Sequence, residues 1–518
     1  MKVFGLLFLL LSVNGAKAIV KPADGLWHTA DDPAIGSGLV LTTQNDLTLI
    51  SLFTYSENGE NIWYVGSGQI DEEGILEVNL YQTQDGQNLL IEHPQSATHI
   101  DETDLLKIEF LGSNRATLQI NGSEVKIITP LHFGHDISYG FPDLSGQWAV
   151  ANLATNQSYV LDLSLEFEGQ LGSQIQYCYV TANSNISGCI VSCHINLAYP
   201  NTNKCVFSDP HDEGGLVTFV GFENLGNKKL QGKTQATNTD FDFQLFRINQ
   251  APNILPNDGH WRTVDDPDVG SGLVMRTQGG YTVVLIYSYD EAGKPEWKIA
   301  SGQFDENGLF SAELFTPFGG SSIQNMEPFV AQIEPQSQTI EVQLDGLELA
   351  RLSIDGSAPK MIQNYNFGTG VFSTDHYMLD DNAFNYPDQT GRWLMVNQDL
   401  SVSRLVNFSY FDPNWSATPP SPRIYGARSY RVNRNDDNDF YLEFTCLKIL
   451  SYDFFVYDVV PYCTGRLFER PESADIKFYF EDIGHRKFRG YFDGFDDDER
   501  NFETIDRNSE YFDFYRVD

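Results

Sequence analysis

The sequence has little positive charge for its length. Its 518 residues hold 33 Lys and Arg against 71 Asp and Glu, which gives a formal net charge of −38. A negative field of that size repels phosphate backbones and anionic lipid surfaces. Nucleic acid is therefore excluded as a partner, and we interpret the acidic balance as a source of solubility.

Long hydrophobic runs are also missing. An apolar run of about ten residues lies at 4–13, which is too short for a membrane-spanning helix of ~20 residues. Lys2 precedes this run, and Ala-Lys-Ala at 16–18 follows it as a small-residue cleavage site. Residues 1–18 are therefore predicted to be a secretory signal peptide, and we expect a secreted or periplasmic protein without an integral membrane segment.

The motifs of several enzyme and metal-site classes are absent from the sequence. It contains no H-E-x-x-H, no G-x-S-x-G elbow, no phosphate-binding glycine loop and no dinucleotide fingerprint. Two Asp-rich runs, 433–439 and 493–499, lack the mid-loop glycine and closing glutamate that an EF-hand combines. No catalytic residue, no metal site and no cofactor is predicted.

Repetition is what the sequence has in abundance. Trp27 recurs as Trp261 and Trp63 as Trp297 at one constant offset, which holds from position 25 to position 134. Such a repeat predicts two copies of one structural unit. We name them A1, residues 19–136, and A2, residues 259–370.

A second repeat separates these units. Phe-Pro-Asp-Leu-Ser-Gly-Gln-Trp at 141–148 is similar to Tyr-Pro-Asp-Gln-Thr-Gly-Arg-Trp at 386–393. It defines unit B1, residues 137–249, and a longer unit B2, residues 371–518. A linker with two prolines, 250–258, joins the halves. The order A1-B1-A2-B2 indicates an ancestral pair of units that was duplicated whole.

The sequence of A1 predicts a succession of β-strands. Residues 47–55 and 61–70 are rich in β-branched and aromatic residues, and Asn58-Gly59 and Asn121-Gly122 are strong hairpin turns. No segment has a sustained helical period. The predicted fold class is all-β, with tandem antiparallel β-barrels or β-sandwiches, since open sheet edges would promote aggregation.

The six cysteines are confined to the B units. An even number in an exported chain favours disulfides; a zinc site is the alternative, but the spacing lacks a C-x2-C pair. The alignment of B1 with B2 predicts bridges Cys193–Cys205 and Cys446–Cys463, with an additional Cys178–Cys189 bridge in B1.

Residues kept in both A copies are candidates for ligand binding. The tryptophans could stack on sugars at a barrel mouth, although the favoured alternative is a plug whose indole N–H bonds a carbonyl. The Asp-Asp-Pro sequences could bind a cation or take part in acid–base chemistry, although a turn is the favoured alternative. The candidates are Trp27, Asp31, Asp32, Trp63, Trp261, Asp265, Asp266 and Trp297.

The motifs of the A units resemble a module that is repeated in exported bacterial proteins of unassigned function. In that module a hairpin reads Tyr-Asp-x-x-Gly-x-Pro-x-Trp. Residues 289–297 fit it fully, and residues 55–63 depart from it at Ser56 and Asn61. The resemblance implies an exported all-β scaffold and no catalytic residues. The opening Gly-x-Trp meander is similar to that of avidin-like and lipocalin-like barrels, which is an analogy of fold.

Three functions are compatible with these features. We expect a non-enzymatic binding or surface protein whose ligand is a glycan, a peptide or a small molecule. One alternative is a secreted, glycan-acting hydrolase with carboxylates at a cleft between A and B units. Another is a carrier that holds an apolar ligand in each barrel, for which the packing of the barrel interior is the test.

Overall fold

The computed structural model confirms the all-β prediction. Every described regular element is a β-strand, and no described helix could cross a membrane. The predicted signal peptide lies outside the described residues. The structure describes residues 22–30, 36–44, 47–86, 88–90, 97–100, 104–112, 115–131, 133, 144–153, 156–171, 174–181, 190–196, 204–208, 216–219, 229–234, 243–248, 255–264, 270–278, 280–324, 329–335, 337–346, 349–365, 367, 391–397, 403–411, 424–434, 441–449, 462–468, 476–483, 487–493 and 511–517.

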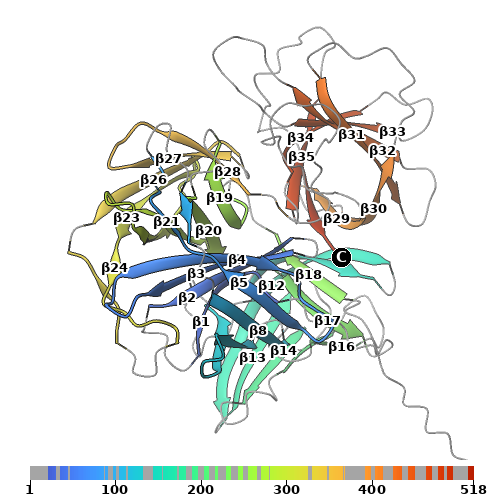
Figure 1. Cartoon of the computed structure of the whole chain (residues 1–518). Helices are drawn as coiled ribbons and strands as arrows, with labels where there is room; N and C mark the ends of the chain where they lie inside the picture. Colours follow the sequence, from blue (N-terminus) through green and yellow to red (C-terminus); the bar gives the residue numbers. More distant parts are fainter. Residues whose placement is uncertain are drawn as a thin grey trace, which may run out of the picture.

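The strands form one eight-stranded sheet in each unit (Figure 1). The strands of A1 are β1 (Gly25–Thr29), β2 (Gly38–Gln44), β3 (Leu47–Tyr55), β4 (Asn61–Gly68), β5 (Ile75–Leu80), β8 (Asp104–Gly112), β9 (Arg115–Ile120) and β10 (Lys126–Pro130), with a short pair β6 (Thr83–Gln84) and β7 (Thr98–His99). Those of A2 are β19 (Gly259–Thr263), β20 (Gly272–Gln278), β21 (Tyr281–Tyr289), β22 (Pro295–Gln303), β23 (Leu309–Phe315), β26 (Gln338–Leu344), β27 (Leu349–Ile354) and β28 (Lys360–Asn364), with a short pair β24 (Pro317–Phe318) and β25 (Gln332–Ile333).

The B units are built in the same way. The strands of B1 are β11 (Gly146–Asn152), β12 (Gln157–Leu171), β13 (Gln174–Thr181), β14 (Val191–Asn196), β15 (Lys204–Ser208), β16 (Leu216–Phe219), β17 (Lys229–Thr234) and β18 (Phe243–Arg247). Those of B2 are β29 (Gly391–Asn397), β30 (Ser403–Phe411), β31 (Ile424–Arg434), β32 (Tyr441–Ile449), β33 (Tyr462–Phe468), β34 (Ile476–Ile483), β35 (Lys487–Asp493) and β36 (Tyr511–Arg516).

Three of the four sheets are closed antiparallel barrels, those of B1, A2 and B2. The A1 sheet runs from β4 to β5, and isolated bridges join these two edges, Ile70 with Leu76 near the turn and Val65 with Tyr81 farther along. In the second bridge Val65 N lies 3.0 Å from Tyr81 O, and Tyr81 N lies 2.7 Å from Val65 O. The equivalent pair in A2, Ile299 and Phe315, belongs to a regular β22–β23 ladder. A1 is thus curled like A2, but isolated bridges replace the ladder that closes A2.

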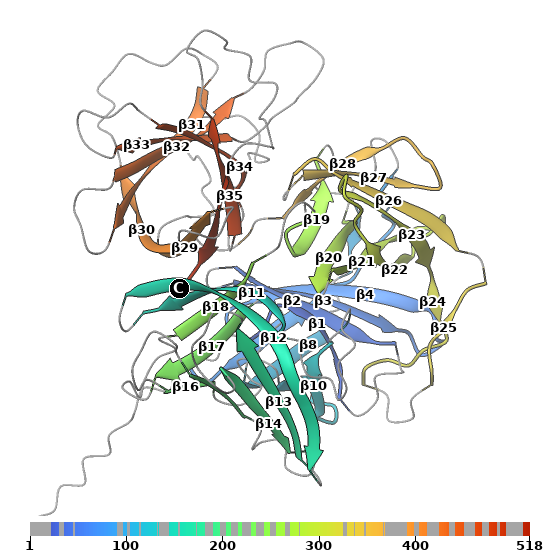
Figure 2. The same ribbon diagram turned by 180° about the vertical axis from the view of Figure 1, so that it is seen from behind.

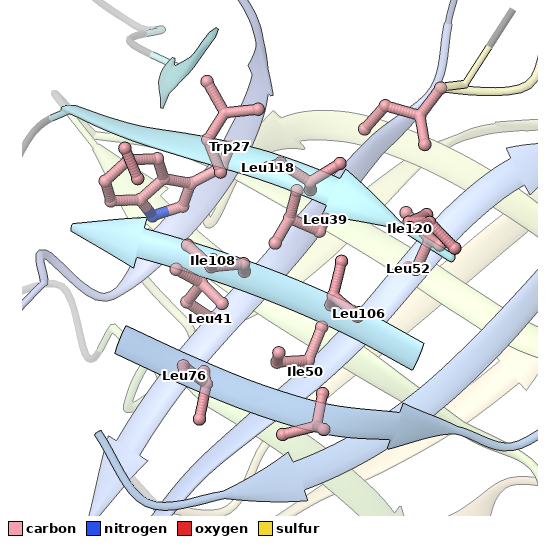
Figure 3. Close-up of a cluster of buried hydrophobic side chains, with 14 of the residues drawn as sticks. Trp27, Leu39, Leu41, Ile50, Leu52, Leu76, Leu106, Ile108, Leu118 and Ile120 are labelled. Carbon is pink, nitrogen blue, oxygen red and sulfur yellow. The ribbon is translucent and has the colours of Figure 1, made fainter. Parts of the chain in front are cut away.

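Aliphatic side chains fill the interior of A1 (Figure 3). Comparable clusters fill A2 and B1. The first tryptophan of A1, A2 and B1 closes one end of its barrel: the indole of Trp27 donates to Ala23 O at 3.0 Å, that of Trp261 to Asn257 O at 3.2 Å and that of Trp148 to Leu144 O at 2.8 Å. Burying each large apolar side chain stabilises a barrel by about 1.5–3 kcal/mol.

The shared hairpin between the third and fourth strands is a turn that requires glycine. Gly59 and Gly293 both have a positive φ, 77° and 78°. In A2 the Asp290 carboxylate accepts hydrogen bonds from the amides of Ala292 and Lys294, at 2.8 and 2.9 Å. In A1 the Ser56 hydroxyl accepts one bond, from Glu60 N at 3.2 Å. The aspartate of the repeated motif therefore serves as a turn cap.

The cysteines predicted to pair lie opposite one another in adjacent strands. Cys193 faces Cys205 in the β14–β15 register, and Cys446 faces Cys463 in the β32–β33 register, which is a spacing that a disulfide can bridge. Cys178 and Cys193 are both disulfide-bonded. Cys193 belongs to the B1 interior cluster, and Cys178 alternates with two residues of that cluster on β13, so these two cysteines lie on opposite faces. Cys189 lies outside the described residues, and the pairing stays a prediction.

Candidate functional site at the A1–A2 interface

The four candidate tryptophans are buried, and none offers a ring face to solvent. Their exposed fractions are 1% for Trp27, 1% for Trp63, 0% for Trp261 and 4% for Trp297. Trp27 and Trp261 are the barrel plugs described above. Trp63 and Trp297 lie between A1 and A2, so a ligand could stack on them only if the two units separated. The other candidates, Asp31, Asp32, Asp265 and Asp266, lie outside the described residues.

Trp63 and Trp297 make reciprocal contacts across the interface. The indole of Trp63 donates to Ser288 O at 3.0 Å, and the indole of Trp297 donates to Thr54 O at 3.2 Å. Ser288 occupies in A2 the repeat position that Thr54 occupies in A1, as Trp297 does for Trp63. Each hydrogen bond is thus the copy of the other under a two-fold relation. A1 and A2 pair as the subunits of an isologous dimer do, within one chain.

The strand ends repeat this reciprocity. The side-chain oxygen of Gln44 accepts from Phe367 N at 2.8 Å, and that of Gln278 accepts from Phe133 N at 3.1 Å. The amide nitrogens of the same glutamines donate to Tyr365 O and to Leu131 O, at 3.1 and 3.2 Å. Each glutamine therefore forms two hydrogen bonds with the backbone of the other unit, at equivalent positions.

Each A unit also extends an arm over the other. We define the A1 arm by residues 83–86, 88–90 and 97–100, and the A2 arm by residues 317–324 and 329–334. Leu89 of the A1 arm belongs to the interior cluster of A2, and Ile323 of the A2 arm belongs to that of A1; both are 1% exposed. Their amides donate to the hydroxyls of Ser288 and Thr54, both at 3.2 Å. Each barrel interior is completed by an aliphatic side chain from its partner.

Aromatic rings fill the centre of the interface. Trp297 lies against Phe53 and Tyr55, with ring centroids 5.6 and 5.9 Å apart. Trp63 lies against the equivalent residues, Tyr287 and Tyr289, at 5.2 and 5.8 Å. Such tilted and edge-on pairs contribute about 0.5–1.5 kcal/mol each beyond the burial of their area. These rings come from the outward faces of β3, β4, β21 and β22, which explains why both faces of these strands are apolar.

A buried polar cluster breaks the symmetry of the A1–A2 interface. His260 of A2 is 2% exposed; its Nε2 lies 2.8 Å from the Ser51 hydroxyl of A1 and its Nδ1 lies 3.2 Å from the Thr42 hydroxyl. Arg276 of A2 donates to Leu41 O at 2.9 Å and to the Thr42 hydroxyl. Both ring nitrogens of His260 thus lie within hydrogen-bond distance of an A1 hydroxyl, and the tautomer of the neutral ring sets which nitrogen donates.

This cluster keeps the histidine uncharged. Burial, and then the nearby Arg276 guanidinium, lower the pKa of His260 to about 3. In A1 the position of His260 is Leu26 and that of Arg276 is Thr42, so only the combination of A1 with A2 supplies both the donors and the acceptors. If two A2 faces paired, Arg276 and Leu285 would stand where Thr42 and Ser51 accept or donate hydrogen bonds, and two buried Arg276 guanidinium groups would meet at this site.

A tyrosine pair breaks the symmetry in a second place. The hydroxyl of Tyr289 lies 2.5 Å from the Thr83 hydroxyl of the A1 arm, and burial raises the pKa of Tyr289 to about 12. The equivalent hydroxyl, on Tyr55, is buried and has no hydrogen-bond partner among the described residues. The reason is that Pro317 stands in the A2 arm where Thr83 stands in the A1 arm. The A2 arm therefore lacks the counterpart of the Thr83–Tyr289 hydrogen bond.

B1 and B2 also pair, through their first, second and last strands. The shared cluster contains Ala149 and Ala151 of B1 with Leu394 and Val396 of B2, which occupy equivalent positions on β11 and β29. The rings of Phe246 and Tyr515, from β18 and β36, lie 5.7 Å apart. Small side chains on one unit thus face large ones on the other, so the chain holds two internal pairs of barrels.

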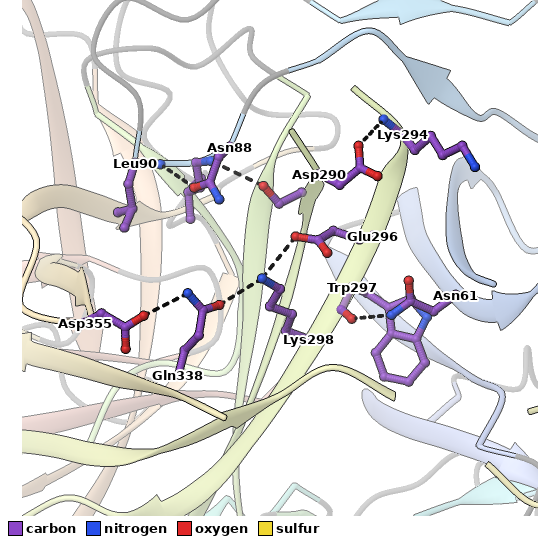
Figure 4. Close-up of polar contacts among 12 residues, drawn as sticks. Asn61, Asn88, Leu90, Asp290, Lys294, Glu296, Trp297, Lys298, Gln338 and Asp355 are labelled. Atoms are coloured by element: carbon purple, nitrogen blue, oxygen red, sulfur yellow. Dashed lines mark hydrogen bonds and ion pairs between the residues drawn. The ribbon is translucent and has the colours of Figure 1, made fainter. Parts of the chain in front are cut away.

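Charged groups near A2 stabilise strands. Lys298 contacts Gln338 at 2.9 Å and Glu296 at 3.1 Å, and Gln338 donates to Asp355 at 2.9 Å (Figure 4). The backbone N–H of Thr339 holds the pKa of Asp355 below its usual value. Figure 4 also shows Asn61 donating to the carbonyl of Trp297 at 2.8 Å, across the A1–A2 interface. Within the described ranges, no three His, Cys, Asp or Glu side chains cluster as metal ligands would.

Comparison with protein-family models and with characterised proteins finds no match for the chain. The site must be interpreted from its own residues. These residues place the two A units back to back, with each one completing the interior of the other.

Proposed function

We propose that the protein is an exported, non-enzymatic binding or surface protein in which internally paired barrels form a rigid scaffold. The observation that carries the proposal is the reciprocal contact of Trp63 and Trp297 with the backbones of Ser288 and Thr54. Residues kept in both copies are expected to serve whatever both copies need. Here Trp63 and Trp297 serve pairing and Trp27 and Trp261 plug the barrels, which leaves the outer loops and arms for contact with a ligand.

The packing of the barrels narrows the class of ligand. Side chains fill the interiors of A1, A2 and B1, and two of these interiors also receive an aliphatic side chain from the partner unit. An apolar small molecule inside a filled barrel would have to displace that core. We therefore favour a peptide or glycan ligand, bound on the outside, over a carrier function.

The experiment is a binding survey of the mature, full-length chain on peptide and glycan arrays. The proposal expects saturable binding to one chemical class, which survives when Asp31, Asp32, Asp265 and Asp266 are all replaced by asparagine. Hydrolysis of chromogenic glycosides or peptides that is lost in the same variant would contradict it and would support a hydrolase. A complete lack of binding on both arrays would also count against it.

A further inference from the structure

The A2 arm has an apolar outer surface. Four of its large hydrophobic side chains are exposed: Phe318 by 37%, Phe329 by 63%, Val330 by 66% and Ile333 by 55%. We call these four the arm patch. They all belong to this one short arm, whereas the other exposed large hydrophobic residues of the described chain come from separate strands and turns. In the β24–β25 register Phe318 is opposite Gln332 and Ile333 is opposite Pro317, so Phe318 and Ile333 project from opposite faces of the pair. Exposed apolar side chains concentrated in one short segment commonly mark an interaction site.

The A1 arm provides an internal comparison. It has the same two short strands and the same inserted aliphatic residue, but its sequence carries Gln84, Gln95, Ser96 and His99 at the positions of the arm patch. The arm fold therefore does not require apolar residues there. Something other than the exchange between barrels accounts for them in A2.

The arm also has free strand edges. β24 and β25 pair only with each other, through Pro317 with Ile333 and Phe318 with Gln332, and neither pairs with another strand among the described residues. Figure 2 shows both at the outer margin of the paired A units. A free edge beside apolar side chains can accept an additional strand, whose backbone supplies hydrogen bonds while its side chains meet the apolar surface.

Two exposed glutamates belong to the segments that adjoin the arm patch. Glu334 follows Ile333 directly, and Glu57 lies two residues before Gly59, whose carbonyl accepts a hydrogen bond from Gly319 N at 2.9 Å. Within the described part of the chain, neither glutamate makes an ion pair, and both are exposed. With a net charge of −38 on the chain, a second copy or an anionic membrane would be repelled, and a basic partner would be attracted.

We propose that the A2 arm docks an extended segment of a partner protein that combines apolar with basic side chains. The segment adds a strand at the edge of β25, its apolar side chains contact residues of the arm patch, and its basic side chains meet Glu57 and Glu334. This inference rests on the proposed binding function and names its site and its class of ligand.

The test uses the full mature chain and a fluorescent peptide of four Lys-Val repeats, with a peptide of four Glu-Val repeats as the charge control. The matched variant gives the A2 arm the residues of the A1 arm: Phe318→Gln, Phe329→Gln, Val330→Ser and Ile333→His. We expect the Lys-Val peptide to bind the natural chain at least tenfold more tightly than the variant, and more weakly as salt rises. Binding should also slow hydrogen exchange at the amide of Ile333, which faces away from β24 because the next amide, that of Glu334, donates to Thr316 O.

Other outcomes would overturn the proposal in recognisable ways. Equal binding of the Lys-Val peptide to both chains, or no binding to either, would remove the arm patch as the site. Dimerisation of the natural chain in sedimentation experiments, lost in the variant, would identify a second copy as the occupant. Co-sedimentation with phosphatidylcholine vesicles, lost in the variant, would identify a membrane surface. Array binding that is identical for chain and variant would leave the general function standing and this site refuted.

Discussion

His260 of A2 lies 2.8 Å from the Ser51 hydroxyl of A1, whereas the symmetry-related contact joins two leucines, Leu26 of A1 and Leu285 of A2. One interface thus holds a polar and an apolar version of the same contact. A duplicated unit that first paired with its own copy would have two identical contacts. The divergence makes each A face complementary to the other and less complementary to itself.

The buried histidine predicts a pH dependence. Its pKa is about 3 in the folded chain against about 6.5 when unfolded. The unfolded chain therefore takes up the proton first, so this contribution to stability is complete above pH 6.5 and falls by up to about 1.4 kcal/mol per pH unit as the pH drops towards 3. Arg276 and Tyr287, which also face His260, keep their charge states over this range.

The variant that tests it is His260→Leu with Ser51→Leu, which copies the contact of Leu26 with Leu285. Urea unfolding of the A pair between pH 5 and 6.5 should have a flatter pH dependence in the variant than in the natural chain. Equal slopes would mean that His260 is already protonated in the folded state.

The reciprocal indole bonds predict matched losses. Trp63→Phe and Trp297→Phe should each destabilise the A pair by about 1–3 kcal/mol, because each leaves a buried carbonyl without its donor. The control is Tyr281→Phe, which alters an exposed residue at the start of β21. Denaturant titrations followed by near-ultraviolet circular dichroism give the values. A loss in one variant only would argue against the two-fold relation.

The exchanged arms predict a cavity effect at a distance. Ile323→Ala should destabilise A1, although the residue belongs to the A2 sequence, by about 2–5 kcal/mol. Ile333→Ala on the same arm is the control and should change stability by less than about 0.5 kcal/mol, because its side chain is exposed. Hydrogen exchange should locate the loosening in β1 to β5. Loosening confined to A2 would refute the exchange.

The two equivalent tyrosines predict opposite responses to the same substitution. Tyr289→Phe removes the hydroxyl that contacts Thr83 and should cost about 0.5–1.5 kcal/mol. Tyr55→Phe removes a buried hydroxyl that lacks a partner among the described residues, so it should be neutral or stabilising. Thermal unfolding of the two variants in parallel measures both. An equal cost would show that Tyr55 has a bound water or another partner.

The disulfide prediction can be checked by peptide mapping without reduction. We expect linked peptides for Cys193 with Cys205 and for Cys446 with Cys463, because each pair is opposed in adjacent strands. A link between Cys178 and Cys193 would contradict the register of β13 and β14, which puts them on opposite faces.

The sequence by itself determined the strands, the turns and the duplication. Alternation and Asn-Gly turns fix a local conformation through the two-residue period of a strand and the positive φ of glycine, and neither depends on distant residues. The constant offset between the A copies made their common fold predictable without any other protein. The plug role of Trp27 was the favoured alternative for the same reason, since its indole reaches the carbonyl of Ala23, which is only one short step back along the chain.

The tertiary structure alone decided what covers the outer faces. From Ile50 to Tyr55, β3 is buried on both faces. The alternation of side chains along a strand shows from the sequence only that both faces are apolar. Whether a sugar, a lipid or another barrel covers the second face depends on contacts between residues far apart in the sequence, such as Trp63 with Ser288. The sequence did mark the polar cluster, because His260 and Arg276 replace Leu26 and Thr42 within a repeat whose other motifs match. The exchange of arms carried none, because Leu89 and Ile323 would fill either interior equally well, and only the path of the chain assigns each to its partner's barrel.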